Sequence, residues 1–252
     1  MLVTGREASR LRFPAPVVGR SVQEVTELRG VLFDFGGTLF AHATLADTIR
    51  RAAGGLGAVR PLAWAEALAD RIQSAAHDPD ELRHPRDLSA AVWKERWHLL
   101  YGLADDEVEG LGAAVYAAMH DPREWRPYAG SLATLHHLHL AGVPVAVVSN
   151  TGWNVRTVFA EYDVHRLVTS FQLSYEVGSV KPAPQIFLAA CAALGTEPAR
   201  TLMVGDDPVA DAGAVRAGLR TLLLPALAPG AANGVEAVLR IVDADSATIR
   251  AR

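Results

Sequence analysis

Residues 31–39 read VLFDFGGTL, an apolar run that ends in a carboxylate, an aromatic residue and two glycines. Such a run predicts a buried strand that opens into a loop directly after Phe33. Ligands of open α/β sheets bind outside the carboxyl ends of the strands, so Asp34 is the first candidate for chemistry. Glycines at positions 36 and 37 would let backbone N–H groups approach an anionic group closely.

Further apolar runs predict more strands of the same sheet. They lie at residues 143–148, 167–173, 201–204 and 221–224. Apolar residues at helical spacing fill the intervals, as in residues 185–194. Strands that alternate with helices predict a parallel sheet covered on both faces, which is a Rossmann-like, doubly wound α/β core.

Residues 43–123 have a different pattern, which is helical throughout. Apolar residues recur there at spacings of three and four in three groups: Leu45, Ile49, Ala52 and Leu56; Trp93, Trp97 and Leu100; Leu111, Val115 and Met119. Nothing in this stretch alternates as a strand does, so we expect about four helices. The predicted organisation is an arm at 1–27, an α/β core at 28–42 plus 124–252, and an all-helical insertion at 43–123.

Composition bounds the class of protein. Of the 252 residues 50% are hydrophobic and 21% charged, and the formal net charge is −4, which together exclude a disordered chain. The weakly acidic balance disfavours a nucleic-acid partner, and no apolar run approaches the roughly 18 residues of a membrane span. The first 20 residues carry charges in place of a signal peptide's apolar segment, and the single cysteine, Cys191, suits a reducing compartment. We therefore expect a cytoplasmic protein without a nucleic-acid or membrane partner, whose oligomeric state the sequence does not reveal.

Polar residues gather where the predicted strands end. Asp34, Ser149 and Asp206 each follow a strand, and Lys181 lies in a loop between two of the strands. Carboxylates that meet at one edge of a sheet cannot all stay ionised without a cation, which favours a bound Mg²⁺. A hydroxyl and an ammonium beside them suit the oxygens of a phosphate group. Asp34 would then act as a nucleophile and form an aspartyl-phosphate.

These residues resemble the four motifs of the haloacid dehalogenase-like (HAD) hydrolases. The matching pieces, in order, are DFGGTL at 34–39, Ser149, Lys181 before Pro182, and GDDPVAD at 205–211. Each piece is common by itself, but four in order at the ends of predicted strands form a specific pattern. The resemblance covers about residues 30–224.

The resemblance implies a role for each matching residue. It implies a phosphatase-type hydrolase of a small phosphorylated substrate, with the helical insertion as a cap over the site. Its catalytic residues would be Asp34 and Lys181; its substrate-binding residues Thr38, Ser149, Asn150 and Lys181; and its Mg²⁺ ligands Asp34, Gly36, Asp206 and Asp211. Gly36 would contribute its backbone carbonyl, and Thr38 would also hold the motif loop.

One position departs from the phosphatases of this family. They carry a second Asp two residues after the nucleophile, which protonates the leaving alcohol and later activates water. Gly36 occupies that position here. A general acid–base group contributes roughly 10²- to 10⁴-fold in rate, so aryl or acyl phosphates, which hardly need protonation, would suffer least from its loss.

Three alternatives remain open at this point. A 2-haloacid dehalogenase also needs no Asp at position 36, but its chemistry needs no metal. A phosphonate-cleaving member would use a lysine of the cap, and Lys94 is the available one. A binding protein that keeps the pocket but turns over little or nothing is the third.

Several other residues invite a functional interpretation that local sequence does not favour. We interpret as structural the linker histidine His42, the surface histidines His136, His137 and His139, the packing residues Trp93 and Trp97, the core residue Cys191 and the helix N-cap Asp207. His42 could in principle replace the missing acid, and one of the two tryptophans could border a substrate pocket.

Overall fold

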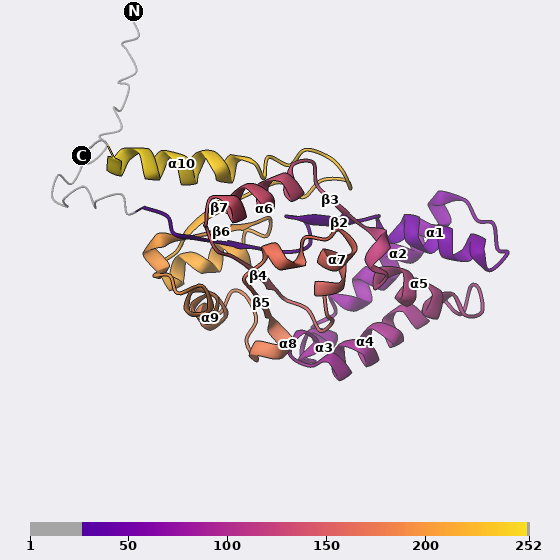
Figure 1. Ribbon diagram of the computed structural model, residues 1–252. Coiled ribbons are helices and arrows are strands. Elements are labelled where there is room, and N and C mark those ends of the chain that lie inside the picture. The colour runs from indigo at the N-terminus through magenta and orange to yellow at the C-terminus, as the bar shows by residue number, and fades with distance from the viewer. Residues whose placement is uncertain (1–26, 251–252) are drawn as a thin grey trace, which may run out of the picture.

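The computed structural model describes residues 27–250, and side chains as far as Asp243 (Figure 1). The predicted arm at 1–27 therefore lies outside the described residues apart from Glu27. Within the described part of the chain, no helix combines the length and the apolar character needed to cross a bilayer.

The core is a five-stranded sheet in which every neighbouring pair is parallel. In spatial order the strands are β5 (Ser170–Leu173), β4 (Val145–Ser149), β1 (Gly30–Phe33), β6 (Thr201–Gly205) and β7 (Arg220–Leu223). The apolar run at residues 31–33 belongs to the central strand, where Leu32 lies in register between Ala146 and Met203. The predicted parallel α/β sheet is confirmed.

Side chains alternate between the two faces of this sheet, and helices bury both. Val31 and Phe33 of β1 pack in one cluster with residues of three helices, whereas Leu32 packs in another with Phe187. The first face is covered by α6 (Ser131–Leu140), α7 (Arg156–Glu161) and α10 (Ala237–Arg250), and the second by α9 (Pro184–Leu194). Figure 1 shows α6 and α10 along the top of the sheet and α9 below it. Burial on both sides explains why the strands are continuously apolar.

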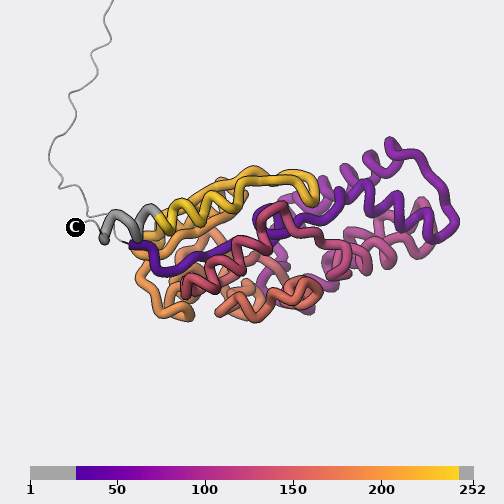
Figure 2. The backbone as a smooth tube through the Cα atoms, turned by 45° about the horizontal axis from the view of Figure 1, so that its top comes forward, coloured from indigo at the N-terminus to yellow at the C-terminus, as the bar shows by residue number. Residues whose placement is uncertain are grey.

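The helical insertion has its own hydrophobic core. Its α-helices are α1 (Leu45–Gly55), α2 (Leu62–Ala76), α3 (Pro79–Leu82), α4 (Ala90–Gly102) and α5 (Leu111–Met119). Four of them have nine residues or more, as expected, and α3 is a single extra turn. Ile49, Ile72, Leu111 and Val115 are fully buried among them. Figure 2 shows these helices projecting from one end of the core.

A two-stranded ribbon joins the insertion to the core. It pairs β2 (Phe40–His42) antiparallel with β3 (Trp125–Pro127), where the chain leaves the core and returns. The sequence analysis predicted neither strand. Each has only three residues, too few for a period-2 pattern to show.

Three elements differ from their predicted form: two strands begin later in the sequence than predicted, and one predicted α-helix is a 3₁₀ helix. The strand expected at 143 begins at Val145, because Pro144 has no backbone N–H to pair. The strand expected at 167 begins at Ser170, after a 3₁₀ turn at His165–Leu167. The helix expected after Asp207 is a 3₁₀ helix at Asp211–Ala217.

Candidate active site

Three neighbouring strands deliver polar side chains to one edge of the sheet. Asp34 follows β1, Ser149 ends β4 and Asp206 follows β6. Lys181 and Asp211 join them from the segments before α9 and after β6, and all five line one cavity of about 380 Å³. The structure thus brings together the carboxylates, hydroxyl and ammonium that the sequence placed at strand ends.

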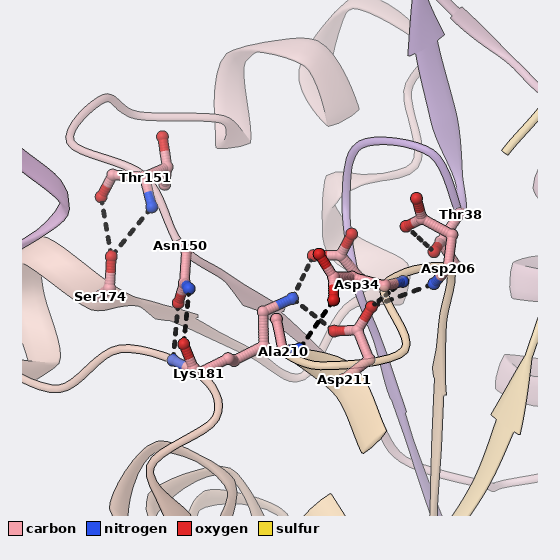
Figure 3. A network of polar contacts seen from close by, with 10 residues as sticks. Asp34, Thr38, Asn150, Thr151, Ser174, Lys181, Asp206, Ala210 and Asp211 are labelled. Atoms are coloured by element: carbon pink, nitrogen blue, oxygen red, sulfur yellow. Dashed lines mark hydrogen bonds and ion pairs between the residues drawn. The ribbon is translucent and has the colours of Figure 1, made fainter. Parts of the chain in front are cut away.

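Lys181 stands between two carboxylates at the centre of the site (Figure 3). Its Nζ donates to Asp34 Oδ1 at 2.5 Å and to Asp211 Oδ1 at 2.7 Å. The three side chains are nearly inaccessible, with Lys181 5%, Asp34 8% and Asp211 0% exposed. Buried ion pairs of this kind hold their members in fixed positions because no water can replace a lost partner.

The other oxygen of Asp211 fixes the loop that carries Asp206. Asp211 Oδ2 accepts hydrogen bonds from the backbone N–H groups of Asp206, at 3.0 Å, and Asp207, at 2.9 Å. A side chain at Gly205 would overlap the Asp211 carboxyl group. The GDD sequence therefore needs its glycine so that the buried carboxylate can reach the loop.

Asp206 is oriented by the loop that follows β1. Thr38 Oγ1 donates to Asp206 Oδ1 at 3.1 Å. Gly37 has a φ of +88°, and a Cβ there would overlap the Asp206 carboxylate. Thr38 itself is fully buried and is not among the residues that line the cavity. Thr38 therefore positions Asp206, and its predicted contact with a substrate stays a prediction.

Asn150 lines the cavity and also anchors Lys181. Its Oδ1 accepts from the Lys181 N–H at 2.7 Å, and its Nδ2 donates to the Lys181 carbonyl at 2.9 Å. The neighbouring Ser149 hydroxyl lines the cavity and has no hydrogen-bond partner among the residues the structure describes. Ser149 is thus free to donate to a ligand, whereas the Asn150 side chain is already engaged.

The electrostatics of the site reflect its excess of carboxylates. Burial raises the pKa of the Asp34 carboxyl to about 7; Lys181 acts against this shift, and Asp211 and Asp206 add to it. Burial also raises the pKa of Asp206. For Lys181, burial lowers the pKa, but Asp34 and Asp211 outweigh it and hold the pKa above its ordinary value. Negative charge therefore accumulates here beyond what one ammonium can balance.

The same carboxylates form a donor set that suits a divalent cation. One oxygen from each of Asp34, Asp206 and Asp211 lies within 4.8 Å of the others. Mg²⁺ prefers oxygen ligands such as carboxylates, and its positive charge would act against the burial and the neighbouring carboxylates that raise the pKa of Asp34. Gly36 lines the cavity beside them, where its carbonyl could add an oxygen. The residues present fit Mg²⁺.

Comparison with known proteins assigns the family. A family model described as haloacid dehalogenase-like hydrolase matches residues 28–218, which is most of the chain and includes all four motifs. The chain belongs to the haloacid dehalogenase-like hydrolases. Two curated relatives, both called glyceraldehyde 3-phosphate phosphatase, come from Methanopyrus kandleri and Methanothermobacter thermautotrophicus. Each is 29% identical; the first match covers 77% of this chain and 83% of the relative, the second 78% and 85%.

Solved structures of HAD hydrolases share the fold. The magnesium-bound putative HAD-hydrolase YfnB of Bacillus subtilis aligns with a TM-score of 0.64, 17% identity, and coverage of 86% of this chain and all of that one. The L-2-haloacid dehalogenase of Xanthobacter autotrophicus aligns with a TM-score of 0.58 and 21% identity over 78% of this chain and 77% of that one. At these identities the likeness concerns the fold alone.

The helical insertion of this HAD hydrolase forms the outer wall of the cavity. Trp93, Trp97 and Tyr101 of α4 line it, together with Met119 and His120 at the end of α5. Both tryptophans also pack within the insertion, as predicted, and both line the cavity, where the sequence analysis allowed that one of them could border a pocket. Their spacing of four places both on one helix face, and nothing in the sequence reveals that this face meets the active site.

Core residues that the sequence analysis missed complete the wall. Phe35 directly follows Asp34, Trp125 begins β3, and Trp153 follows the loop after β4. The ring centroids of Phe35 and Trp125 lie 4.6 Å apart, and those of Trp125 and Trp153 6.1 Å apart. Trp153 sits four residues beyond Ser149, so its place in a strand-end loop was the one available signal.

His120 is held as a neutral imidazole in this wall. Trp93 Nε1 donates to His120 Nε2 at 2.9 Å, and His120 Nδ1 lies 2.8 Å from the Tyr116 carbonyl. Burial lowers the pKa of His120; the Tyr116 carbonyl acts against this shift, and His98 and His42 add to it. Because Nε2 already accepts a hydrogen bond, His120 has no proton to offer a leaving group from that nitrogen.

The remaining sequence candidates lie outside the cavity wall or, like Asp207, have a structural role. His42 is outside the cavity wall, with its ring nitrogens 3.0 and 3.2 Å from the carbonyls of Ala43 and Ala118. Lys94 is exposed on α4, also outside the wall, which removes the basis for a phosphonatase. Asp207 accepts from the N–H groups of Val209 and Ala210, a capping role. His136, His137 and His139 are exposed, and Cys191 is buried.

Proposed function

We propose that this HAD hydrolase is a Mg²⁺-dependent phosphatase of a small phosphorylated molecule, with Asp34 as its nucleophile and the helical insertion as its cap. The observation that carries the proposal is the buried Lys181 paired to Asp34 and Asp211, with Asp206 completing a carboxylate triangle. The phosphatase names of the two archaeal relatives support the reaction class. The single cysteine supports a cytoplasmic site of action.

The first chemical step is transfer of the phosphoryl group to Asp34. A carboxylate oxygen of Asp34 attacks phosphorus, the bond from phosphorus to the ester oxygen breaks, and its electron pair leaves on that oxygen. Lys181 and the Ser149 hydroxyl would donate to the phosphoryl oxygens, where negative charge is spread in the transition state. Asn150 keeps the Lys181 backbone in place.

Mg²⁺ would be held by Asp34, Asp206, Asp211 and the Gly36 carbonyl, and it would neutralise charge on the carboxylates and the phosphoryl group. Thr38 orients Asp206 for this role, and Gly37 leaves room for it. The insertion would shield the site from bulk water during the first step, which favours attack on phosphorus by Asp34 over attack by water.

The second step is hydrolysis of the aspartyl-phosphate, and this chain lacks the usual general base for it. Water must lose a proton as it attacks, and the position of the usual base is Gly36. Among the other residues lining the cavity, the nearby carboxylates are engaged with Lys181, Thr38 or backbone N–H groups, and His120 accepts from Trp93. Hydrolysis of the intermediate should therefore limit turnover.

Release of p-nitrophenol from its phosphate ester, with Mg²⁺ and with EDTA, tests the proposal. The nitrophenolate needs no proton to leave, so Gly36 does not hinder the first step. We expect steady turnover with Mg²⁺, at least about 100-fold above the rate with EDTA, because three carboxylates then lose their counter-charge. Equal rates in both would contradict a metal-dependent phosphatase and favour the dehalogenase alternative.

A binding protein with little turnover is the second candidate, because Gly36 leaves the site without its usual acid and base. Its signature would be calorimetric binding of inorganic phosphate with Mg²⁺ and no release of p-nitrophenol under the same conditions. That pair of results would replace the phosphatase proposal.

A further inference from the structure

We propose that the substrate of this site is an aryl phosphate, the phosphate ester of a phenolic compound whose flat ring lies against the aromatic wall of the cavity. This inference rests on the proposed phosphatase function and deepens it. It comes from three features of the cavity: its aromatic lining, the separation of its charges, and the surroundings of Gly36.

Aromatic side chains are concentrated around this one cavity. Four of the chain's five tryptophans line it, namely Trp93, Trp97, Trp125 and Trp153, while Trp64 of α2 does not. They belong to two groups of rings. On the core side Phe35, Trp125 and Trp153 contact one another, with centroids 4.6, 6.1 and 6.3 Å apart, and on the insertion side Trp97 lies 5.6 Å from Trp93 and 5.1 Å from Tyr101.

His120 contacts one ring of each group. Its ring centroid lies 6.3 Å from that of Trp93 and 5.3 Å from that of Trp153, with an edge-to-face geometry in both cases. The indole N–H groups of Trp93 and Trp125 are used within the protein, by His120 and the Met119 carbonyl. These two rings therefore offer a ligand apolar surface more than hydrogen bonds, which suits a flat apolar group.

The charged residues of the cavity all belong to the core. They are Asp34, Lys181, Asp206, Asp207 and Asp211. The insertion contributes Trp93, Trp97, Tyr101, Met119 and the neutral His120. The phosphate of a substrate therefore meets charge, while the rest of the substrate meets no ionic partner on the insertion. A substrate with a second phosphate or a carboxylate would leave that group unpaired.

The surroundings of Gly36 select the leaving group. A Cβ on Gly36 would lie 3.4 Å from the ring of Trp125, so an indole borders the place from which the usual acid would extend. The leaving oxygen must then depart without a proton from that position. A phenolate does so far more readily than an alkoxide, because a phenol has a pKa of about 10, against about 16 for water.

Besides the residues of the site and the Mg²⁺ they would hold, the resulting reaction consumes only water. Asp34 attacks phosphorus, the bond between phosphorus and the aryl oxygen breaks, and the phenolate takes its proton from solvent after release. Water then attacks the aspartyl-phosphate, which yields phosphate, one proton and the free carboxylate. No oxidant or further reactant takes part.

Four substrates separate this inference from the proposed function. Acetyl phosphate is small and has a good leaving group, so it reports on the charged half of the site alone. 2-Naphthyl phosphate has a flat aromatic ring on its leaving group. Glyceraldehyde 3-phosphate has an aliphatic leaving group, and phosphocholine carries a cation, which aromatic rings also attract. We expect kcat/KM for 2-naphthyl phosphate to exceed the values for the last two by about 100-fold or more.

Variants at Trp97 test the wall itself. Trp97 Nε1 is buried without a hydrogen-bond partner in the described part of the chain, so Trp97→Phe keeps a ring and loses no bond. We expect Trp97→Leu to lower the ratio of kcat/KM for 2-naphthyl phosphate over acetyl phosphate about tenfold. Trp97→Phe should retain most of that ratio, and Trp64→Leu, outside the cavity, should leave it unchanged. Unfolding midpoints for each variant confirm that the fold is intact.

The outcomes are distinct. Acetyl phosphate turnover without a preference for the aryl ester, or an unchanged ratio in Trp97→Leu, would overturn the aryl inference and leave the phosphatase standing. Equal or faster hydrolysis of phosphocholine would assign the aromatic wall to a cation instead. If none of the four substrates is hydrolysed in the presence of Mg²⁺, the proposed function and this inference are both refuted.

Discussion

Replacement of Asp34 by Asn is expected to reduce p-nitrophenyl phosphate turnover at least about 10⁴-fold, to the background rate. The amide has nearly the shape of the carboxylate but cannot attack phosphorus. The fold should not suffer, because burial and the neighbouring carboxylates disfavour the ionised form of Asp34 more than Lys181 favours it, and Lys181 keeps Asp211 as a partner. Without added metal at pH 8, we expect the Asn variant to unfold at an equal or higher temperature than the wild type, a trade of stability for activity.

Asp207→Asn is the matched control for this variant. Asp207 lies next to Asp206 and lines the same cavity, but its oxygen caps the turn by accepting from Val209 and Ala210. Asparagine can accept the same bonds, so this variant should keep most of the activity. If an Asp34→Asn protein of confirmed sequence keeps full turnover, Asp34 is not the nucleophile.

Lys181→Met is expected to have the largest effect on stability. It leaves Asp34 and Asp211 buried with no cation within reach, and loss of one partner of a buried pair costs about 3–5 kcal/mol in free energy of unfolding. Loss of a charged donor to the phosphoryl group should also lower kcat by roughly 10²- to 10³-fold. Urea unfolding without divalent cations, together with the p-nitrophenol assay, measures both effects.

The stability loss in Lys181→Met should grow with pH. The folded pKa of Asp34, about 7, lies above its unfolded value of about 3.9, so the folded state binds more protons and the free energy of unfolding falls as pH rises between them. Removal of Lys181 takes away the charge that lowers this pKa and extends the window above 7. The loss should therefore be larger at pH 8 than at pH 6, and added Mg²⁺ should recover more of it than in the wild type.

Lys94→Met is the control, because Lys94 is the other lysine of the chain and is exposed on α4. Its replacement should change the free energy of unfolding by less than about 0.5 kcal/mol at either pH. A Lys181→Met protein as stable and as active as Lys94→Met would show that the central ion pairs are dispensable.

The sheet could be predicted from sequence because its strands are buried on both faces. Runs such as residues 31–33 and 145–149 are continuously apolar and end in polar residues, so both the element and its functional end are visible. The three-residue strands β2 and β3 cannot be predicted in this way, because their pairing depends on where the insertion leaves and rejoins the core. The 3₁₀ helix at residues 211–217 begins at Asp211, whose side chain is held by Lys181, a contact 30 positions away that periodicity does not report.

The charged half of the site could also be predicted from the sequence, because its residues lie where strands end or in a loop between two strands. Asp34, Ser149, Lys181 and Asp206 all line the cavity as expected. Thr38 differs because it donates to Asp206 and does not line the cavity, in a loop where Gly37 has a φ of +88°. A single sequence does not report that angle.

The aromatic half was not predicted because it is assembled from distant segments. Trp93 and Trp97 have the helical spacing of any packing pair, and Trp125 and Trp153 belong to short connections. What unites them is the docking of α4 over the strand ends, where a side chain at Gly152 would overlap Trp93. Periodicity describes one element at a time and is silent on such contacts between elements.

The most direct test of the central claim is the intact mass of the protein, quenched in acid during turnover of acetyl phosphate with Mg²⁺. Because Gly36 supplies no base for the second step, the aspartyl-phosphate should accumulate. We predict wild-type protein heavier by one phosphoryl group, carried by the peptide that contains Asp34, and no such species in Asp34→Asn. Turnover with unmodified protein throughout, or a phosphoryl group on any other residue, would contradict the account.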